Sequence, residues 1–137
     1  MLAAEFTGGL LVIQRNDDLS KVAETGERID AELSKPLLLA IFNQYSPLHD
    51  GAVLIGEGRI RAARCILPVS DDAELPPTLG FRHRAAIGMS EVTDAAIIAI
   101  SEETGRLSLA TDGKLASNLS LYDLEEKLVR YLARPLT

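Results

Sequence analysis

Three short stretches of this chain combine ionisable side chains with glycine: residues 48–52 (LHDGA), 80–86 (GFRHRAA) and 101–105 (SEETG). Each lies at the end of a run that is expected to form a strand or a helix, and the two histidines of the chain both fall within these stretches. Loops at the ends of rigid elements are common positions for catalytic groups. We therefore treat the three stretches as parts of one candidate site.

The first stretch offers a base and a metal ligand side by side. Asp50 followed by Gly51 is also a common turn dipeptide, but His49 precedes it directly. A carboxylate can act as a general base toward a ribose hydroxyl, and an adjacent imidazole can ligate a divalent metal that neutralises phosphate charge. Glycine at position 51 would let a nucleotide approach the backbone closely.

The second stretch contains Arg82, His83 and Arg84, the densest basic cluster of an acidic chain. It lies near the predicted N-terminus of a helix, where backbone N–H groups also favour anions, so phosphate is the expected ligand. Taken alone the tripeptide is a weak signal, because a solvated face with capping roles would look the same.

The third stretch follows an apolar run. Ser101 offers a hydroxyl group for phosphate, and Glu102 and Glu103 offer carboxylates for a metal or for an arginine partner. The same residues could also form an acidic, solvated turn.

Bulk properties limit the classes of function. The length of 137 residues with 47% hydrophobic residues suits one globular domain, residues 1–137. A net charge of −6 argues against a nucleic-acid partner. Cys65, the single cysteine, lies in an apolar run and is expected to fill the core. No run approaches the roughly 18 apolar residues that span a bilayer, so we expect the chain as given to be soluble and cytoplasmic.

Hydrophobic periodicity predicts the elements that position these stretches. Strands are expected at residues 9–14, 52–55, 59–67, 95–100 and 106–110, with the second and third joined by the glycine-bearing turn 56–58. Helices are expected from the Ser34 cap to near Asn43, at 82–94 and at 121–133 after the Ser120 cap. Gly88 weakens the middle helix, and the prolines in 75–80 indicate a surface loop. The pattern predicts an α/β fold, a single domain with a central mixed, largely antiparallel sheet flanked by helices.

These residues resemble the diadenylate cyclase family, whose hallmark motifs are D-G-A and R-H-R. The motifs correspond here to residues 50–52 and 82–84, in the expected order. The likeness extends over residues 9–14, 24–33, 47–53, 82–94 and 101–105, almost the whole chain, and is greatest to the catalytic domain of the membrane-anchored class.

The resemblance implies that two ATP molecules are joined into cyclic di-AMP with release of two pyrophosphates, at the interface of a face-to-face homodimer. It makes Asp50 the base for the 3'-hydroxyl and assigns catalytic roles to Gly51, Arg82 and His83. The implied substrate-binding residues are Gly51, Ala52, Leu67 through its backbone, Arg82, His83, Arg84, Ser101 and Glu102. His49 and Glu103 are the candidate ligands of a divalent metal, Mn²⁺ or Mg²⁺ and possibly Co²⁺.

Two departures from the family pattern affect these expectations. The family commonly has a small hydroxyl residue before R-H-R, whereas this chain has Phe81, which cannot donate a hydrogen bond to phosphate. The membrane-anchored class also has three transmembrane helices, and none precedes Gly8 here. We expect a native protein anchored at the inner face of the cell membrane through such a region.

Other functions fit part of the pattern. A regulatory module could keep the fold and bind nucleotide with little or no catalysis. A metal-dependent hydrolase could use His49, Asp50, His83 and Glu102 as ligands. An interaction module could dock partners on the apolar stripes of the helices at 36–42 and 121–133, although such stripes more often face a core.

Overall fold

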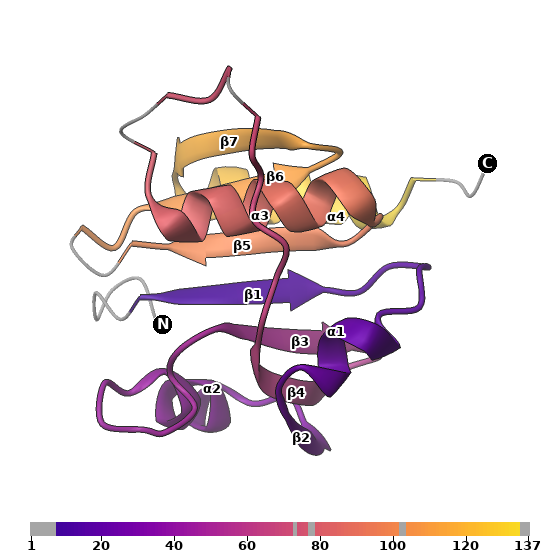
Figure 1. Ribbon diagram of the computed structural model, residues 1–137, viewed down its shortest axis with the longest axis vertical. Helices are drawn as coiled ribbons and strands as arrows, with labels where there is room; N and C mark the ends of the chain where they lie inside the picture. The colour runs from indigo at the N-terminus through magenta and orange to yellow at the C-terminus, as the bar shows by residue number, and fades with distance from the viewer. Residues whose placement is uncertain (1–7, 73, 77–78, 102–103, 135–137) are drawn as a thin grey trace.

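The computed structural model describes residues 8–72, 74–76, 79–101 and 104–134, and it places them around one seven-stranded sheet (Figure 1). The strands are β1 (Gly9–Ile13), β2 (Glu27–Glu32), β3 (Ala52–Gly56), β4 (Arg59–Cys65), β5 (Ala96–Ile100), β6 (Leu107–Thr111) and β7 (Lys114–Leu119). The helices are α1 (Ser20–Glu24), α2 (Lys35–Phe42), α3 (Phe81–Val92) and α4 (Leu121–Leu132).

The sheet has the order β2-β4-β3-β1-β5-β6-β7. Only β1 and β3 run parallel, with Leu10 opposite Ala52, and the other neighbouring pairs are antiparallel. The prediction of a single α/β domain with a mixed, largely antiparallel sheet is confirmed.

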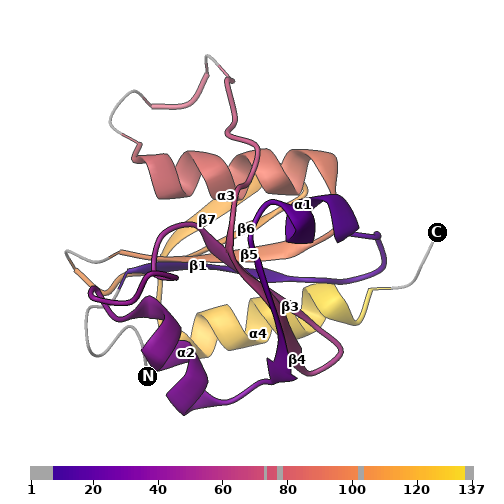
Figure 2. The ribbon, with the colours of Figure 1, turned by 60° about the horizontal axis from the view of Figure 1, so that its bottom comes forward.

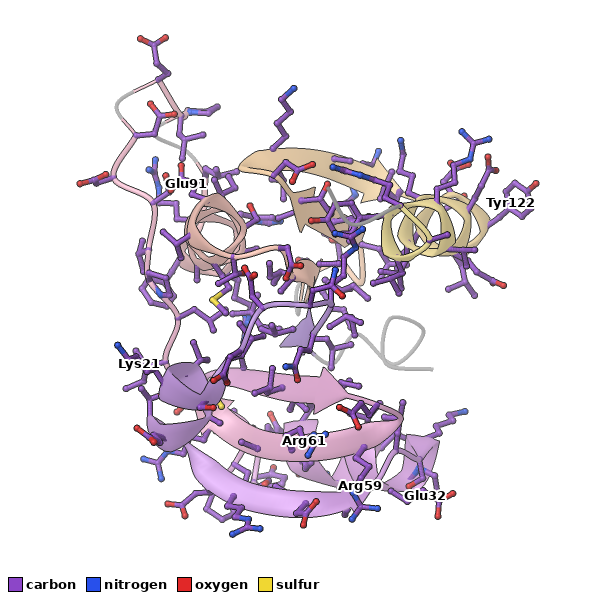
Figure 3. All side chains as sticks on the ribbon, turned by 90° about the vertical axis from the view of Figure 1, so that its right-hand side faces the viewer. Lys21, Glu32, Arg59, Arg61, Glu91 and Tyr122 are labelled. Carbon is purple, nitrogen blue, oxygen red and sulfur yellow. The ribbon has the colours of Figure 1, made fainter. Side chains whose placement is uncertain are left out.

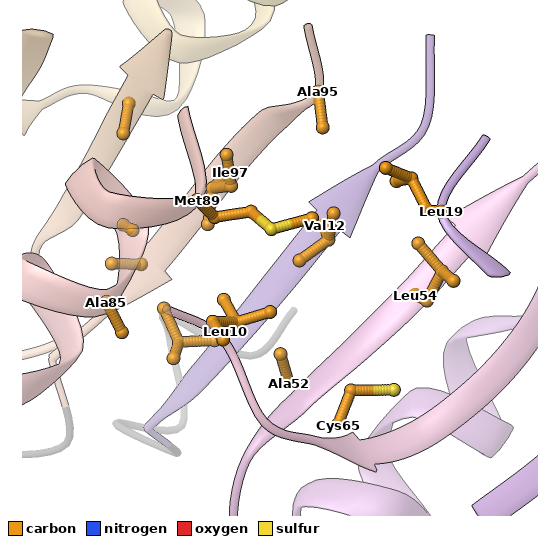
Figure 4. Close-up of a cluster of buried hydrophobic side chains, with 14 of the residues drawn as sticks. Leu10, Val12, Leu19, Ala52, Leu54, Cys65, Ala85, Met89, Ala95 and Ile97 are labelled. Atoms are coloured by element: carbon orange, nitrogen blue, oxygen red, sulfur yellow. The ribbon is translucent and has the colours of Figure 1, made fainter. Parts of the chain in front are cut away.

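Helices cover both faces of the sheet and enclose two cores (Figure 2). Helices α1 and α3 lie on one face, where Met89 of α3 packs against Val12 and Ile97 (Figure 4). Helices α2 and α4 lie on the other face, and they contribute Phe42 and Tyr131 to the second core. The apolar stripes of α2 and α4 therefore bury residues in the core, as the pattern favoured.

Local capping chemistry explains where two of the helices begin. The hydroxyl of Ser34 accepts a hydrogen bond from the Leu37 backbone at 3.2 Å, and that of Ser120 accepts one from Asp123 at 3.0 Å. Each bond satisfies a first-turn N–H group that has no partner within its own helix. Both predicted caps are confirmed.

Three elements were absent from the predictions: α1, β2 and β7. Helix α1 has five residues, too few to show a hydrophobic period. Strands β2 and β7 form the two edges of the sheet, and polar residues occupy at least half of their positions, so they lack the apolar runs by which the inner strands were found. Strand β4 ends at Cys65, two residues before the predicted end.

Helix α3 tolerates its internal glycine because another segment crosses there. Residues 68–72, here called the strap, pass over α3 (Figure 1). A Cβ atom at Gly88 would lie 2.2 Å from the carbonyl oxygen of Pro68 and 2.6 Å from the Ser70 nitrogen. The glycine that weakens the helix by propensity is therefore required for close packing.

Candidate functional site

The register of the strands brings the three sequence stretches to one end of the sheet. At this end Ala52 lies opposite both Leu10 and Cys65, while Ile100 lies opposite Gly9 and Leu107. The residues that precede β3 and the residues that follow β4 and β5 therefore share an edge. Helix α3 also begins at this end, on the left in Figure 1.

The loop before β3 presents a carboxylate and an imidazole together. His49 Nε2 lies 3.4 Å from Asp50 Oδ1, and the Asp50 side chain is 81% exposed. The other ring nitrogen, Nδ1, is 2.7 Å from the carbonyl oxygen of Ser46. The tautomer that donates from Nδ1 to this carbonyl leaves the Nε2 lone pair directed toward the side of Asp50, where it can bind a cation.

Gly51 allows Asp50 to sit against the end of β4. Its φ of +81° is in the left-handed region, and a Cβ atom would lie 2.7 Å from the Cys65 carbonyl oxygen. A hollow of about 400 Å³ opens beside this contact. Three stretches of the chain form its walls: Thr25, Gly26 and Glu27; Asp50 and Gly51; and Arg64 and Ile66.

Most of these wall residues were missed by the sequence reasoning, which placed only Asp50 and Gly51 there. One available signal was Gly26, where a Cβ atom would lie 2.2 Å from the Ala63 carbonyl oxygen. The neighbouring Thr25 hydroxyl accepts a hydrogen bond from the Ile66 backbone at 2.8 Å and donates one to the Val22 carbonyl at 2.6 Å. Thr25 thereby fixes the chain that leaves β4.

Ala52 and Leu67 have buried side chains, with exposed fractions of 0% and 6%. Both side chains belong to the core between the sheet and α3. A ligand at this edge could therefore meet only their backbone atoms. Substrate binding by Ala52 and by the Leu67 backbone stays a prediction.

Helix α3 places His83 against the sheet. His83 Nε2 is 3.3 Å from the hydroxyl of Ser108, a buried residue of β6 that sequence reasoning did not single out. Burial lowers the pKa of His83 below its ordinary value, and the positive charge of Arg82 lowers it further. A neutral imidazole held by Ser108 is therefore the stable form near neutral pH.

The first turn of α3 can also receive an anion. The N-cap residue Gly80 supplies no side-chain acceptor, so the first N–H groups of the helix have no cap from that residue. Arg82 follows in the same turn and is partly buried. Helix N-termini with a nearby guanidinium favour phosphate.

Arg84 is bonded to the loop that precedes α3. Its Nε donates to the Leu79 carbonyl at 3.1 Å, and its NH2 group donates to the Pro76 carbonyl at 2.8 Å. Its guanidinium therefore holds the loop that leads into α3. Binding of substrate by Arg84 remains a prediction.

Ser101 directly follows β5. Its backbone nitrogen donates to the Arg106 carbonyl, and its hydroxyl accepts from the Thr104 backbone at 3.3 Å. Glu102 and Glu103, predicted for substrate and metal, lie outside the described residues.

His49 and Asp50 could hold a metal ion whose remaining ligands are phosphate oxygens of a bound nucleotide. Within the described part of the chain, no three histidine, cysteine or acidic residues gather as a metal site. His49 and Asp50 provide an imidazole and a carboxylate, a pair that fits Mn²⁺ or Co²⁺ and leaves further positions for phosphate oxygens. Of the ligands proposed for a hydrolase, the described members His49, Asp50 and His83 do not gather as a metal site, and His83 lies against Ser108.

Comparisons with known proteins give a consistent result. A family model described as DisA bacterial checkpoint controller nucleotide-binding matches residues 1–115. The diadenylate cyclase CdaS of Bacillus thuringiensis is 49% identical over 114 residues, which make up 83% of this chain and 57% of that protein. The cyclic di-AMP synthase CdaA of Bacillus subtilis is 44% identical over 127 residues, 93% of this chain and 46% of that protein. The chain spans about half the length of these curated relatives.

Solved structures agree with the sequence matches. A crystal structure of DacA from Staphylococcus aureus, a double mutant, superposes with a TM-score of 0.91 at 41% identity. The match covers 97% of this chain and 89% of that chain. A hypothetical membrane spanning protein from Bacillus cereus superposes with a TM-score of 0.82 at 47% identity, over 87% of this chain and 58% of that chain. In the part of this chain that the structure describes, no helix has the length and apolar character needed to cross a bilayer.

Proposed function

The chain belongs to the family of diadenylate cyclase domains, and we propose that it condenses two ATP molecules into cyclic di-AMP with release of two pyrophosphates. The observation that carries the proposal is the convergence of the D-G-A loop, the end of β4 and the first turn of α3 at one edge of the sheet. A carboxylate, a nucleoside-sized hollow and an anion-binding helix end are the parts that nucleotidyl transfer needs.

Asp50 is the proposed base for the 3'-hydroxyl. Its exposed carboxylate borders the hollow, and Gly51 beside it leaves the Cys65 carbonyl uncovered by any Cβ atom. A ribose in the hollow would place its hydroxyl groups near this carboxylate. General-base catalysis by a positioned carboxylate contributes about 10²–10⁴ in rate.

Arg82, His83 and the first turn of α3 are proposed to hold the phosphates, with Ser101 from the neighbouring strand end. The ring nitrogen of His83 that does not face Ser108 would donate a hydrogen bond to a phosphate oxygen, or pass its proton to that oxygen. Arg82 adds a fixed positive charge beside it. Glu102 and Arg84 are further proposed contacts of the substrate.

A divalent metal would be held by His49, with Glu103 as the second proposed ligand and phosphate oxygens completing the sphere. Mn²⁺, Mg²⁺ or Co²⁺ would neutralise charge on the phosphates and on the leaving pyrophosphate when bound. His49 is prepared for this role by the Ser46 carbonyl, which fixes the orientation of its ring.

Catalysis is proposed to need two protomers face to face, because each domain offers one nucleotide site and the product contains two new phosphodiester bonds. The rate per protomer should therefore rise with protein concentration until the dimer is saturated. The anchoring of the native protein at the inner face of the membrane is likewise a proposal, supported by the similarity to the hypothetical membrane spanning protein from Bacillus cereus.

The test is mass spectrometry of the products after incubation of the purified chain with ATP and Mn²⁺ or Mg²⁺. We expect cyclic di-AMP from the unmodified chain, about 10²-fold or more less from Asp50→Asn, and an unchanged amount from the control Asp71→Asn on the exposed strap. Binding of ATP without product at any protein concentration would support the regulatory module instead.

Phe81 allows a second test of the phosphate site. Its side chain is 71% exposed in the first turn of α3, so replacement by threonine removes no core packing. Phe81→Thr restores the hydroxyl that the family commonly has, and a new hydrogen bond to phosphate would be worth about 1 kcal/mol or more. We expect a higher kcat or a lower KM for ATP; a variant with lower kcat/KM would contradict a phosphate at this turn.

A further inference from the structure

A second hollow, of about 620 Å³, lies at the other end of the strands from the candidate site. Gln14, which follows the end of β1, lines it, whereas the candidate site lies at the start of β1. Apart from Gly26, its lining shares no residue with the smaller hollow. Figure 3 views this end of the sheet, with Arg59 and Arg61 labelled on β4 and Lys21 on α1.

The bottom of this larger hollow is apolar. Leu19, Leu54 and Ala62 are buried residues of the core below α1, and Ala23 of α1 is partly buried above them. The volume falls in the usual range of small-molecule pockets, about 300–1,000 Å³. A ligand with an apolar body can therefore be accommodated between α1 and the sheet.

Arg61 supplies a polar atom that lacks a partner in the described part of the chain. Its NH2 group lies 3.4 Å from Glu57, across the β3–β4 turn. Its Nε atom is buried, and its N–H group donates no hydrogen bond to any described residue. A buried guanidinium N–H without an acceptor is costly, and an anionic oxygen would satisfy it with a strong, charge-assisted bond.

The acidic side chains around the hollow limit how much negative charge a ligand can carry. Asp18 and Glu24 lie on its exposed rim, and Asp30 is held by Arg59 at 3.0 Å. Arg28 also lines the hollow, 3.7 Å from Asp30, so three carboxylates stand against two guanidinium groups in the lining. Three carboxylates would repel a nucleoside triphosphate, which carries several negative charges, much more than a single carboxylate. The larger hollow is therefore matched to a monoanion.

We propose that the larger hollow is a second ligand site, which binds a small molecule with an apolar body and one carboxylate group. The apolar body lies on Leu19, Leu54 and Ala62, and the carboxylate accepts the hydrogen bond of Arg61 Nε. The two hollows adjoin at Gly26, but neither Arg61 nor this apolar floor lines the smaller one, so the proposal does not depend on the proposed cyclase activity.

The probe is 4-fluorobenzoate, followed by ¹⁹F NMR on the complete chain, with the neutral 4-fluorobenzamide as the matched ligand. A ligand of about ten heavy atoms should bind in the millimolar range, and the benzamide more weakly. Arg61→Gln should weaken the benzoate about tenfold or more, because the charge-assisted bond is lost. Arg130→Gln is the matched control, since Arg130 of α4 makes the same kind of i,i+4 ion pair, with Glu126, and does not line the hollow.

A second variant tests the volume independently of Arg61. Ala23→Leu fills the hollow from α1 and should abolish benzoate binding while Arg61 remains. ATP should not displace the benzoate. Equal binding by the unmodified chain and Arg61→Gln, displacement by ATP, or no saturable binding to the unmodified chain would each overturn the proposal. Thermal unfolding of Arg61→Gln should show no loss of stability beyond that of Arg130→Gln, because each variant loses one i,i+4 ion pair and the removed Arg61 Nε atom is unpaired.

Discussion

Gly88→Ala tests whether the strap fixes the position of α3, which carries the proposed phosphate-binding residues. The added Cβ atom would lie 2.2 Å from the Pro68 carbonyl oxygen, against 3.4 Å for an ordinary contact. Helix and strap must therefore separate by about 1 Å. That movement also strains the 2.9 Å hydrogen bond from the Ser70 nitrogen to the Arg84 carbonyl.

The change in the free energy of unfolding is the sum of two destabilising effects and one stabilising effect. Overpacking in a close contact costs about 1–3 kcal/mol, and a weakened backbone hydrogen bond costs about 1 kcal/mol. The change from glycine to alanine inside a helix returns about 1 kcal/mol. We expect a net loss of about 2 kcal/mol in the free energy of unfolding, or roughly 8 °C in Tm for a domain of this size.

Activity should fall as well, because α3 carries Arg82 and His83 at its start. A displacement of about 1 Å in a catalytic group can cost on the order of 10²-fold in rate. The assays are urea denaturation and cyclic di-AMP production at a temperature where the variant is folded.

The matched control is Val92→Ala, one turn further along the same helix and 67% exposed. It changes helix propensity without crowding and should leave stability within about 0.5 kcal/mol of the unmodified chain. Gly88→Ala with unchanged stability and unchanged product formation would refute the reasoning that the strap determines where α3 lies.

Three further outcomes are expected. The pKa of His83, measured by NMR titration, should lie below 6.5 and rise in Arg82→Gln. Because folding favours the neutral imidazole of His83, this residue contributes stability above about pH 6.5, and the contribution is lost as the pH falls through the lower pKa of the folded state. The free energy of unfolding of His83→Gln should therefore decrease less over this pH range than that of the unmodified chain. A steeper decrease in the variant would contradict the lowered pKa. Cys65 should react slowly with a disulfide reagent at pH 8 in the native state and quickly after unfolding, because burial raises the pKa of its thiol to about 11. Tyr131→Phe should destabilise the chain by about 1–2 kcal/mol in urea, because the 2.8 Å bond to the Asp94 carbonyl is lost; an unchanged midpoint would show that water replaces it.

The sequence alone determined the inner part of the fold. Strands β1, β3 and β5 are apolar runs buried on both faces, and the caps of α2 and α4 are local hydroxyl interactions within a few residues. Such signals do not depend on distant parts of the chain. The motif residues of the candidate site could be named for the same reason, since their types and order are local.

Tertiary structure alone decided how those residues are used. Ser108 meets His83 across 25 positions of sequence, and the Thr25 hydroxyl meets the Ile66 backbone across 41. Arg84 was grouped with its neighbours by sequence, but its guanidinium is directed to the Pro76 and Leu79 carbonyls by the path of the loop. The polar edge strands β2 and β7 form because the inner strands offer them hydrogen-bonding partners. These features arise from contacts between distant segments, which no window of sequence contains.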